Sequence, residues 1–250
     1  RRRMSKLLDL FCGAGGAAFG YHLAGFEDIT GVDIAPQKHY PFRFIQGDAL
    51  EFLAEHGGEY DFIHCSPPCQ GYSVMNNLPW LKGRDYPLLI LPTLEMLEAL
   101  GKPYILENVM GARHGAKGLS KRGLEAHGLK AGWLCGQMFG LPFYRHRLFA
   151  TNWFWLQPGH PKHRIRTIPS PHDGGGTMNH GRPRDLYHWQ NGLHEGVGIG
   201  HVKGWRLAAE AMGIDWMKRA ELTQAIPPYY TFYIGSRLRE VPQVAAGRIP

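Results

Sequence analysis

The sequence predicts an α/β fold built on a doubly wound, mostly parallel sheet, and three observations lead to this prediction. Short apolar segments alternate with helical ones between Lys6 and Ala150. A glycine-rich turn, Cys12-Gly13-Ala14-Gly15-Gly16, follows the first apolar segment. Polar or reactive residues stand where several apolar segments end, which is the edge where open α/β sheets bind their ligands.

The expected elements follow one another in a regular order. Strands are predicted where short apolar runs occur, at 6–11, 29–34, 42–45, 60–64 and 103–106. Helices are predicted between them, at 16–24, 49–55 and 87–100. Two more short strands are expected at 133–135 and 147–150. A helical pattern returns at 205, and Pro227 and Pro228 open a last helix that runs through Leu238.

Residues 152–204 differ in composition from the rest of the chain. They are rich in Gly, Pro, His, Arg and Trp and show no sustained helical period. Their charges are mainly basic and include Arg164, Arg166, Arg182 and Arg184. We interpret this range as a small irregular lobe, inserted into a main domain formed by residues 1–151 and 205–250.

The composition fits one well-packed domain that acts on a polyanion. The chain has 250 residues, of which 44% are hydrophobic, and this is enough for one core. No apolar run suggests a membrane span or a signal peptide, so we expect a cytoplasmic protein without membrane association. The formal net charge of +7 suits a nucleic-acid partner but is a weak signal alone.

The cysteines and histidines do not form a recognisable ligand framework. Cys12, Cys65, Cys69 and Cys135 are scattered, which favours a reduced intracellular setting. Cys65 and Cys69 resemble half of a zinc site, but no second pair answers them, so no metal is expected. The histidines of the second half are interpreted as a solvated basic surface, because their spacings are irregular: His160, His163, His172, His180, His188, His194 and His201.

Cys69 lies in the segment HCSPPCQGYS, directly after a predicted strand. Pro67 and Pro68 end that strand and stiffen the turn, because proline fixes φ and cannot continue a sheet ladder. Backbone N–H groups and basic residues near such a turn favour the thiolate that nucleophilic attack requires. The alternative is an ordinary small, half-buried cysteine.

Acidic residues end the neighbouring predicted strands. Asp33 follows the second strand, where doubly wound folds place an acid against ribose hydroxyls, and Asp48 follows the third and suits an adenine amino group. A helix cap is the alternative for both. Glu107 would reach the same edge as Cys69, where a protonated carboxyl can donate to a ring nitrogen. Arg145 and Arg147 alternate on a strand and share a face, either as phosphate contacts or as an ordinary surface pair.

Read in order, these segments resemble the DNA cytosine-5 methyltransferase family. The matching motifs are the Asp9–Gly16 turn, Pro-Pro-Cys-Gln at 67–70, Glu-Asn-Val at 107–109, Arg-x-Arg at 145–147 and Thr-Gln-Ala-Ile-Pro-Pro at 223–228. Phe143 and Gln224 depart from the family, which usually has glutamine and asparagine there. The resemblance implies a Rossmann-like methyltransferase fold, in which residues 152–204 form the target recognition region.

The resemblance also implies the cofactor and the site residues. S-adenosylmethionine would be bound by Phe11, Cys12, Gly13, Ala14, Gly15, Gly16, Asp33, Ile34, Asp48, Ala49, Pro68, Leu88, Gln224 and Ile226. Cys69 would add to carbon 6 of a flipped cytosine, Glu107 would stabilise the adduct, and Asn108 would hold the cysteine loop. Arg145 and Arg147 would complete the catalytic group, with Arg147 on the oxygen of the base. DNA would be contacted by Gln70, Ser73, Arg164, Arg166, Arg182 and Arg184.

The expected partner is double-stranded DNA, methylated by a monomer in a bacterial or phage-infected cell, with or without a cognate restriction nuclease. One alternative is the tRNA-methylating branch of the same family, whose chemistry is identical. A second is a non-catalytic module that binds S-adenosylmethionine or DNA. A nucleotide-binding reductase is a third, which the proline-flanked cysteine disfavours.

Overall fold

The structure, a computed structural model, describes residues 5–72, 85–113, 127–141, 143, 145–162 and 205–240. The strands are β1 (Lys6–Leu10), β2 (Asp28–Asp33), β3 (Arg43–Gln46), β4 (Phe62–Cys65), β5 (Tyr104–Val109), β6 (Lys130–Leu134) and β7 (Arg147–Thr151). The α-helices are α1 (Gly16–Leu23), α2 (Ala49–His56), α3 (Ile90–Leu100), α5 (Trp205–Met212), α6 (Arg219–Gln224) and α7 (Pro228–Glu240). Short 3₁₀ turns lie between them at η1 (Gly57–Glu59), η2 (Gln70–Tyr72), η5 (Met110–Arg113) and η6 (Gly136–Phe139).

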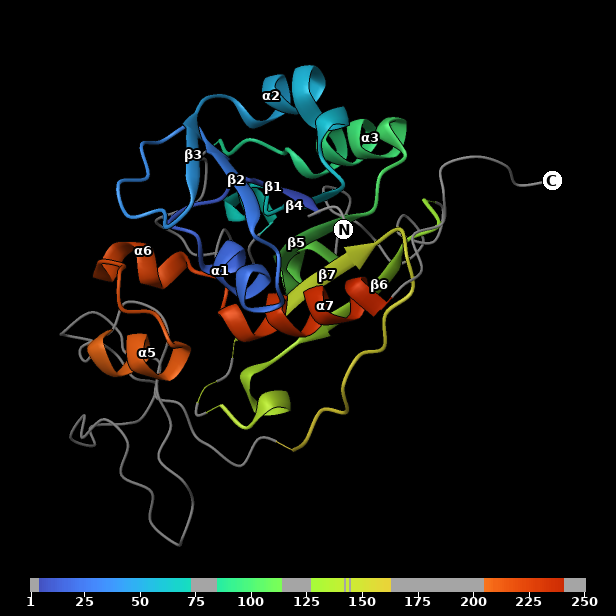
Figure 1. The fold of residues 1–250 in the computed structure, drawn as a ribbon. Coiled ribbons are helices and arrows are strands. Elements are labelled where there is room, and N and C mark those ends of the chain that lie inside the picture. Colours follow the sequence, from blue (N-terminus) through green and yellow to red (C-terminus); the bar gives the residue numbers. More distant parts are fainter. Residues whose placement is uncertain are drawn as a thin grey trace, which may run out of the picture.

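The strands form one sheet in the order β3-β2-β1-β4-β5-β7-β6 (Figure 1). β1 to β5 pair in parallel, whereas β7 runs antiparallel to both of its neighbours, β5 and β6. This confirms the predicted α/β fold with a mostly parallel sheet. Because β7 is reversed, the start of β7 lies at the same edge as the carboxyl ends of β1 to β5.

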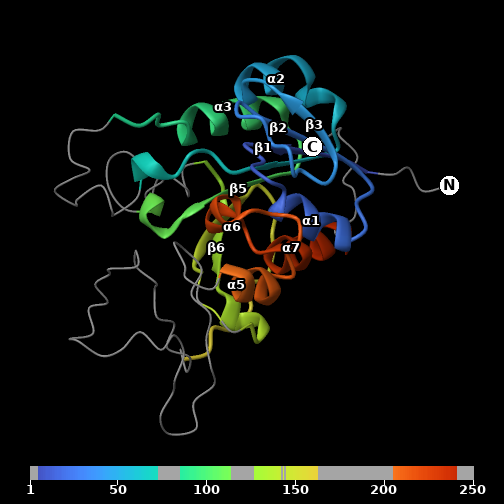
Figure 2. The same ribbon diagram turned by 90° about the vertical axis from the view of Figure 1, so that its left-hand side faces the viewer.

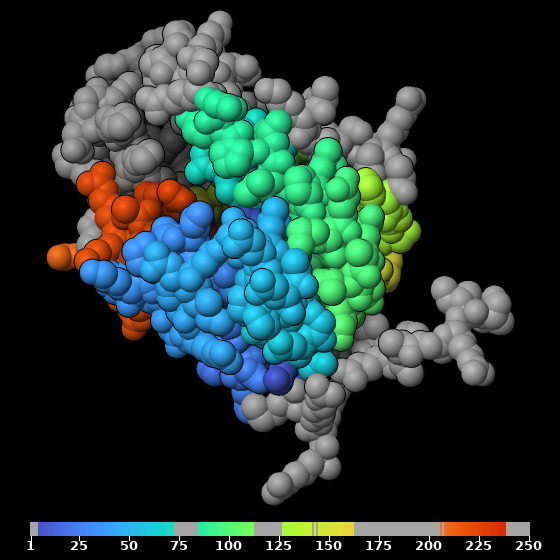
Figure 3. Space-filling model, turned by 90° about the horizontal axis from the view of Figure 1, so that it is seen from above, coloured from blue at the N-terminus to red at the C-terminus, as the bar shows by residue number. Residues whose placement is uncertain are grey.

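Helices cover both faces of the sheet (Figures 1 and 2). Successive strand residues point to opposite faces. Leu7, Ile105 and Phe149 therefore pack in the core with α1 and α7. Their neighbours Leu8 and Leu106 pack in the core with α2 and α3. Seen from above, α2 and α3 lie side by side over that second face (Figure 3).

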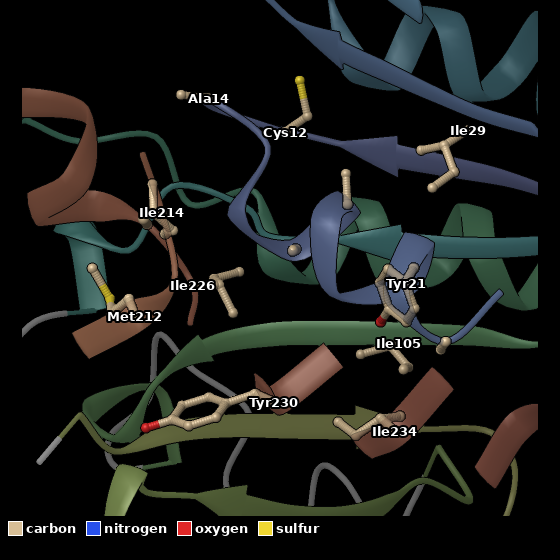
Figure 4. Close-up of a cluster of buried hydrophobic side chains, with 14 of the residues drawn as sticks. Cys12, Ala14, Tyr21, Ile29, Ile105, Met212, Ile214, Ile226, Tyr230 and Ile234 are labelled. Atoms are coloured by element: carbon tan, nitrogen blue, oxygen red, sulfur yellow. The ribbon is translucent and has the colours of Figure 1, made fainter. Parts of the chain in front are cut away.

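Helices α1 and α7 approach each other very closely. A Cβ at Gly20 of α1 would collide with the carbonyl oxygen of Pro228 and the hydroxyl of Thr231 in α7. The Thr231 hydroxyl donates to the carbonyl of Ala17 over 2.8 Å. Tyr21 and Ile234 lie in the core between these helices and the sheet (Figure 4). The last helix is thereby fixed to the helix that follows the first strand.

The predicted elements are found with bounds shifted by at most three residues. The fifth strand continues to Val109, beyond the predicted end at Leu106, because β7 pairs with it from Ile105 to Val109. Helix α6 was not predicted. In the part of the chain that the structure describes, no helix is long and apolar enough to cross a membrane.

The start of the 152–204 range lies against the sheet. Asn152 accepts a hydrogen bond from the N–H of Tyr104 over 3.0 Å and donates to the carbonyl of Lys102 over 2.8 Å. Trp155 is buried and packs against Phe149. Residues 163–204 lie outside the described residues, so the division into a main domain and a recognition lobe stays a prediction.

Candidate active site

The turn after β1 has a backbone conformation that lets a ligand approach the main chain closely. Phe11, Gly13 and Gly15 all have positive φ, at 56°, 50° and 86°. A Cβ at Gly13 would meet no described atom within 4 Å, so this part of the turn faces open space. A Cβ at Gly15 would instead lie 2.7 Å from Cδ of Pro41. Gly13 therefore leaves room for a ligand, and Gly15 is required by packing.

Asp33 ties the end of β2 to this turn. One carboxylate oxygen accepts the N–H of Gly13 over 3.0 Å, and the other accepts the N–H of Ala35 over 2.9 Å. A carboxylate oxygen has a further lone pair, so both remain able to accept from a ligand. Beside it, the Ile34 side chain is 71% exposed, which is unusual for a large apolar residue and offers a flat surface for a ring.

Asp48 is the N-cap of α2. Its Oδ1 accepts from the N–H groups of Leu50 and Glu51 over 2.8 and 3.1 Å. The helix-cap interpretation of this residue is therefore correct, and its second oxygen stays available. The predicted cofactor residues Cys12, Ala14, Gly16 and Ala49 are buried.

The C-terminal segment closes this region from one side. Nε1 of Trp216 donates to the carbonyl of Ala14 over 2.8 Å. A Cβ at Gly16 would lie 2.5 Å from the carbonyl oxygen of Ile226, so the chain before α7 rests on the start of α1. Gln224 ends α6 and is exposed. On the other side, Leu88 packs against Gly71 near the turn that holds Pro68.

Cys69 lies in a braced turn at the carboxyl edge of the sheet. β4 ends at Cys65, and Cys69 stands four residues later, directly before η2, with its side chain partly exposed. Nδ2 of Asn108 donates to the carbonyl of Pro67 over 2.9 Å. Oδ1 of Asn108 accepts the N–H of Val109 over 3.0 Å. A single amide thus joins the cysteine turn to the end of β5.

The thiol of Cys69 is held in its neutral form in this structure. Burial and the negative charge of Glu107 raise its pKa above the ordinary value, and the charges of Arg147 and Arg145 only partly oppose this. The expectation that backbone N–H groups and nearby basic residues favour the thiolate is therefore wrong for the net effect, because burial and Glu107 raise the pKa by more than these groups lower it. Burial is the largest of these effects, and together with Glu107 it outweighs the two cations.

Glu107 is buried beside Arg147, and its Oε1 lies 3.2 Å from Nε of that residue. Burial raises the pKa of the carboxyl, while Arg147 and a hydrogen bond from Ser66 lower it. Burial is the largest of these effects, so the carboxyl takes up a proton more readily than an exposed glutamate. The site can therefore hold a protonated acid, as the sequence suggested.

The two arginines are not a surface pair. Arg145 is buried, and its Nη2 donates to the carbonyl of Thr223 over 2.8 Å. Its own carbonyl accepts the hydroxyl of Tyr230 over 2.7 Å. Its Nε has no hydrogen-bond partner among the described residues, and burial lowers its pKa to about 9. Arg145 links the start of β7 to α6 and α7, whereas Arg147 faces Glu107.

His64 is a buried part of the site that the sequence reasoning missed. Its Nδ1 lies 2.8 Å from the hydroxyl of Tyr21, and its Nε2 lies 2.9 Å from Oγ of Ser66, which also contacts Glu107. Burial lowers the pKa of the imidazole to about 3, so the ring is neutral. A histidine inside an apolar strand, five residues before Cys69, was the available signal.

Some predicted contacts cannot be placed. Gln70 is exposed at the start of η2, beside Cys69. Ser73, Arg164, Arg166, Arg182 and Arg184 lie outside the described residues. The structure thus brings together Cys69, Glu107, Asn108, Arg145 and Arg147, and separately groups Gly13, Asp33, Ile34 and Asp48 along the same edge.

Comparison with known proteins decides the family. Residues 5–151 match the family described as C-5 cytosine-specific DNA methylase, which is more than half of the chain. The chain belongs to this family. The methylase therefore belongs with enzymes that methylate cytosine in DNA, and S-adenosylmethionine is the methyl donor that this membership implies.

Individual relatives agree with this assignment. The methylase is 27% identical over 215 residues to the Type II methyltransferase M.AquIA of a Picosynechococcus species, covering 73% of this chain and 82% of that one. It is 32% identical over 127 residues to the Type II methyltransferase M.FnuDI of Fusobacterium nucleatum, covering 48% and 35%. The S. pombe Dnmt2 methyltransferase structure superposes with a TM-score of 0.57 at 14% identity, over 94% of this chain and 98% of that one, which shows the shared fold.

Proposed function

We propose that this methylase transfers a methyl group to carbon 5 of a cytosine that has left the duplex, through a covalent adduct with Cys69. The observation that carries the proposal is the convergence of Cys69, Glu107 and Arg147 at one edge, around a turn that Asn108 braces. A binding module has no use for these three groups together. The base must be flipped because a stacked ring cannot be reached by a nucleophile and a methyl donor.

The residues at the ends of β1 to β3 fit S-adenosylmethionine. The turn leaves open space at Gly13, Asp33 has free lone pairs for ribose hydroxyls, and exposed Ile34 suits the adenine ring. Asp48 has an oxygen left for the adenine amino group. When bound, the cofactor supplies an electrophilic methyl group on a sulfonium. The site residues of this chain do the rest of the chemistry.

Glu107 couples the charge of the base to that of Cys69. A protonated Glu107 donates to ring nitrogen 3 of cytosine and no longer presents the negative charge that raises the pKa of the thiol. Arg147 and Arg145 then favour the thiolate. Base binding would in this way lower the pKa of the Cys69 thiol and favour the nucleophilic thiolate. Without the target base the thiol of Cys69 stays neutral, so it is a poor nucleophile until the base is bound.

The reaction balances around Cys69. The thiol loses its proton to water, and the sulfur forms a bond to carbon 6 while the ring takes up negative charge, which Glu107 stabilises at nitrogen 3. Carbon 5 then gains the methyl group. Loss of the carbon 5 proton to water restores the double bond and breaks the bond between sulfur and carbon 6. The products are 5-methylcytosine, S-adenosylhomocysteine and the thiolate of Cys69, which takes up a proton from water to become the thiol again.

We propose double-stranded DNA as the substrate and residues 152–204 as the region that selects the sequence. Two relatives are named Type II methyltransferases, and the basic composition of this range suits phosphate contacts. A role as a monomer beside a cognate restriction nuclease is the biological setting that fits these relatives. Gln70, next to the nucleophile and exposed, is placed to contact the strand that holds the flipped base.

A duplex with 5-fluorocytosine in the target tests the adduct, because fluorine cannot leave as a cation. With S-adenosylmethionine present, we expect a complex that survives denaturation and disappears in Cys69→Ala. Glu107→Gln should slow its formation about 100-fold or more, because the ring loses its proton donor. Cys65→Ser is the matched control and should form the complex, because Cys65 is buried and its Sγ lies 3.2 Å from the carbonyl of Ile105.

Two outcomes would contradict the proposal. Methylation of ordinary DNA by Cys69→Ala would exclude the covalent route. Trapping on tRNA substituted with 5-fluorocytosine, but not on any duplex DNA, would replace DNA by RNA as the substrate. Bisulfite sequencing of DNA from cells that express the methylase identifies the target sequence, which the 5-fluorocytosine test duplex must contain.

A further inference from the structure

A second cluster of reactive side chains lies on the outer part of the sheet, beyond the residues that the proposed reaction uses. Cys135 directly follows β6, and His146 directly precedes β7. Leu134 pairs with Arg147 in the antiparallel ladder, so Cys135 and His146 stand opposite each other one step further on. Opposite residues of an antiparallel pair bring their side chains within contact distance.

His160 reaches the same place from a different part of the chain. Oε1 of Gln157 accepts the N–H of Trp133 over 2.9 Å, and a Cβ at Gly132 would meet the ring of Trp155 at 2.6 Å. These contacts fix the chain after β7 along β6. The His160 ring consequently lies 4.7 Å from the Trp133 ring and 5.5 Å from that of His146. His160 is thus a half-buried residue with ring contacts, and the other histidines interpreted as a solvated surface lie outside the described residues.

We propose that Cys135, His146 and His160 form a zinc-binding site. Their Sγ and ring nitrogen atoms all lie within 4.8 Å of one another. Tetrahedral zinc, with bonds of about 2.0–2.1 Å to nitrogen and 2.3 Å to sulfur, places such atoms roughly 3.4–3.6 Å apart. Small side-chain rotations close this difference. One sulfur and two imidazoles are a donor set that zinc prefers, and a fourth ligand, water included, completes it.

The surroundings of Cys135 include donors that suit a metal-bound thiolate. Burial raises the pKa of the free thiol, while backbone N–H groups of Gln137 and Arg145 donate to its sulfur. Such donors orient a ligand and stabilise its negative charge, as outer-shell partners of metal sites do. Cys135 is buried, while His146 and His160 are partly buried, so an ion would be shielded yet reachable. The same donor set also holds copper in electron-transfer sites, and metal analysis separates the two.

The zinc site would connect two parts of the methylase. His146 stands between Arg145 and Arg147, and its side chain points to the opposite side of the strand. His160 lies shortly before residues 163–204, which contain most of the proposed recognition region. A bound ion would link the chain at His160 to β7, the strand that supplies Arg147, and would fix the position of one relative to the other.

The test uses the full chain, purified without a histidine tag, and measures metal content by mass spectrometry. We expect about one zinc per chain. Cys135→Ser, His146→Ala and His160→Ala should each lower bound zinc about tenfold or more. His56→Ala is the matched control, because His56 pairs with Glu59 on the surface, far along the chain from the cluster, and should retain the zinc.

Cobalt substitution provides a second readout that does not depend on enzymatic activity. The wild-type protein with cobalt should show the absorption bands of four-coordinate cobalt and a thiolate-to-cobalt charge-transfer band. Cys135→Ser should lose the charge-transfer band, whereas Cys65→Ser should keep it. Absence of bound metal in the wild type, copper in place of zinc, or a charge-transfer band that persists in Cys135→Ser would overturn the proposal.

Discussion

At the scale of single residues, the carboxylate of Asp33 combines a structural and a proposed binding role. It receives N–H groups from Gly13 and Ala35 on separate oxygens, so it fixes the turn that faces the proposed cofactor. An asparagine can accept on only one atom and would turn an N–H₂ toward the other donor. The position is therefore sensitive even to an isosteric change.

The first prediction follows from this geometry. Asp33→Asn and Asp33→Ala should each weaken binding of S-adenosylmethionine about tenfold or more, a loss of about 1.4 kcal/mol, in isothermal calorimetry. Cys69→Ser should bind the cofactor as the wild type does, because the cysteine turn is a separate part of the edge. Equal losses in Asp33→Ala and Cys69→Ser would show that the cofactor binds elsewhere.

The second prediction concerns His64 and acid stability. Its pKa is about 3 in the folded protein and about 6.5 when exposed, so the folded state binds fewer protons between these values. The stability that comes from the neutral ring is complete above pH 6.5 and is lost progressively as the pH falls toward 3. Between pH 7 and pH 5 the free energy of unfolding should fall by about 2 kcal/mol from this residue alone.

Urea unfolding at both pH values measures this effect. His64→Asn removes the titrating group, so its free energy of unfolding should depend on pH less steeply than that of the wild type, whatever its absolute stability. The carboxyl groups contribute to both proteins and cancel in the comparison. Parallel pH profiles would rule out His64 as the source.

The sequence was sufficient to predict which residues lie together at the edge of the sheet. It was not sufficient to predict a pKa shift that depends on several charges and on burial. Cys69, Glu107 and Asp33 follow or end apolar strands, and parallel strands bring such residues to one edge. The sign of the pKa shift of Cys69 depends on how burial, Glu107 and Arg147 combine in space. Cys135 and His146 meet through the pairing of β6 with β7, and His160 joins them because Gln157 holds the chain after β7 along β6.

At the scale of elements, the contact between α1 and α7 depends on a missing side chain. Gly20 lies where a Cβ would overlap Pro228 and Thr231, so Gly20→Ala must push the helices apart. We expect the free energy of unfolding to fall by about 1–3 kcal/mol, as overpacked cores usually do. Chemical denaturation measures the change.

Gly58→Ala is the control for this third prediction. A Cβ at Gly58 would meet no described atom within 4 Å, and its φ is not in the left-handed region. Its stability should stay within about 0.5 kcal/mol of the wild type. If Gly20→Ala is equally harmless, the two helices are packed less closely than described.

The pattern of apolar residues in the sequence predicts some elements of the fold and not others. The alternation of apolar runs was sufficient for the parallel strands β1 to β5. It gave no sign that β7 is reversed, because direction is not encoded in an apolar run. The extension of β5 to Val109 likewise comes from its partner β7, and α6 is too short, at six residues, for a helical pattern to stand out.

At the scale of the whole molecule, the fourth prediction concerns how the methylase holds DNA. Replacing Arg164 and Arg166 with glutamine should weaken binding and lower the slope of log K against log salt by about 2, if both contact phosphates. A titration of duplex affinity against salt concentration measures this slope.

A charge-matched control distinguishes specific contacts from net charge. Lys38 and Arg43 are exposed near β3, and neither is among the proposed nucleic-acid contacts. Replacing both with glutamine removes the same charge and should leave the slope nearly unchanged. Equal slopes in the two double variants would count against phosphate contacts at Arg164 and Arg166.

The fastening of α7 to α1 has a consequence for synthesis on the ribosome. The first strand and its turn are made early, but Trp216, Ile226 and α7, which rest on them, leave the ribosome much later. A nascent chain therefore contains every residue of the proposed reaction before it contains the C-terminal segment that packs beside the turn after β1. Methylation should begin only upon release of the chain, and a message cut short before α7 should yield a protein that leaves the genome unmarked.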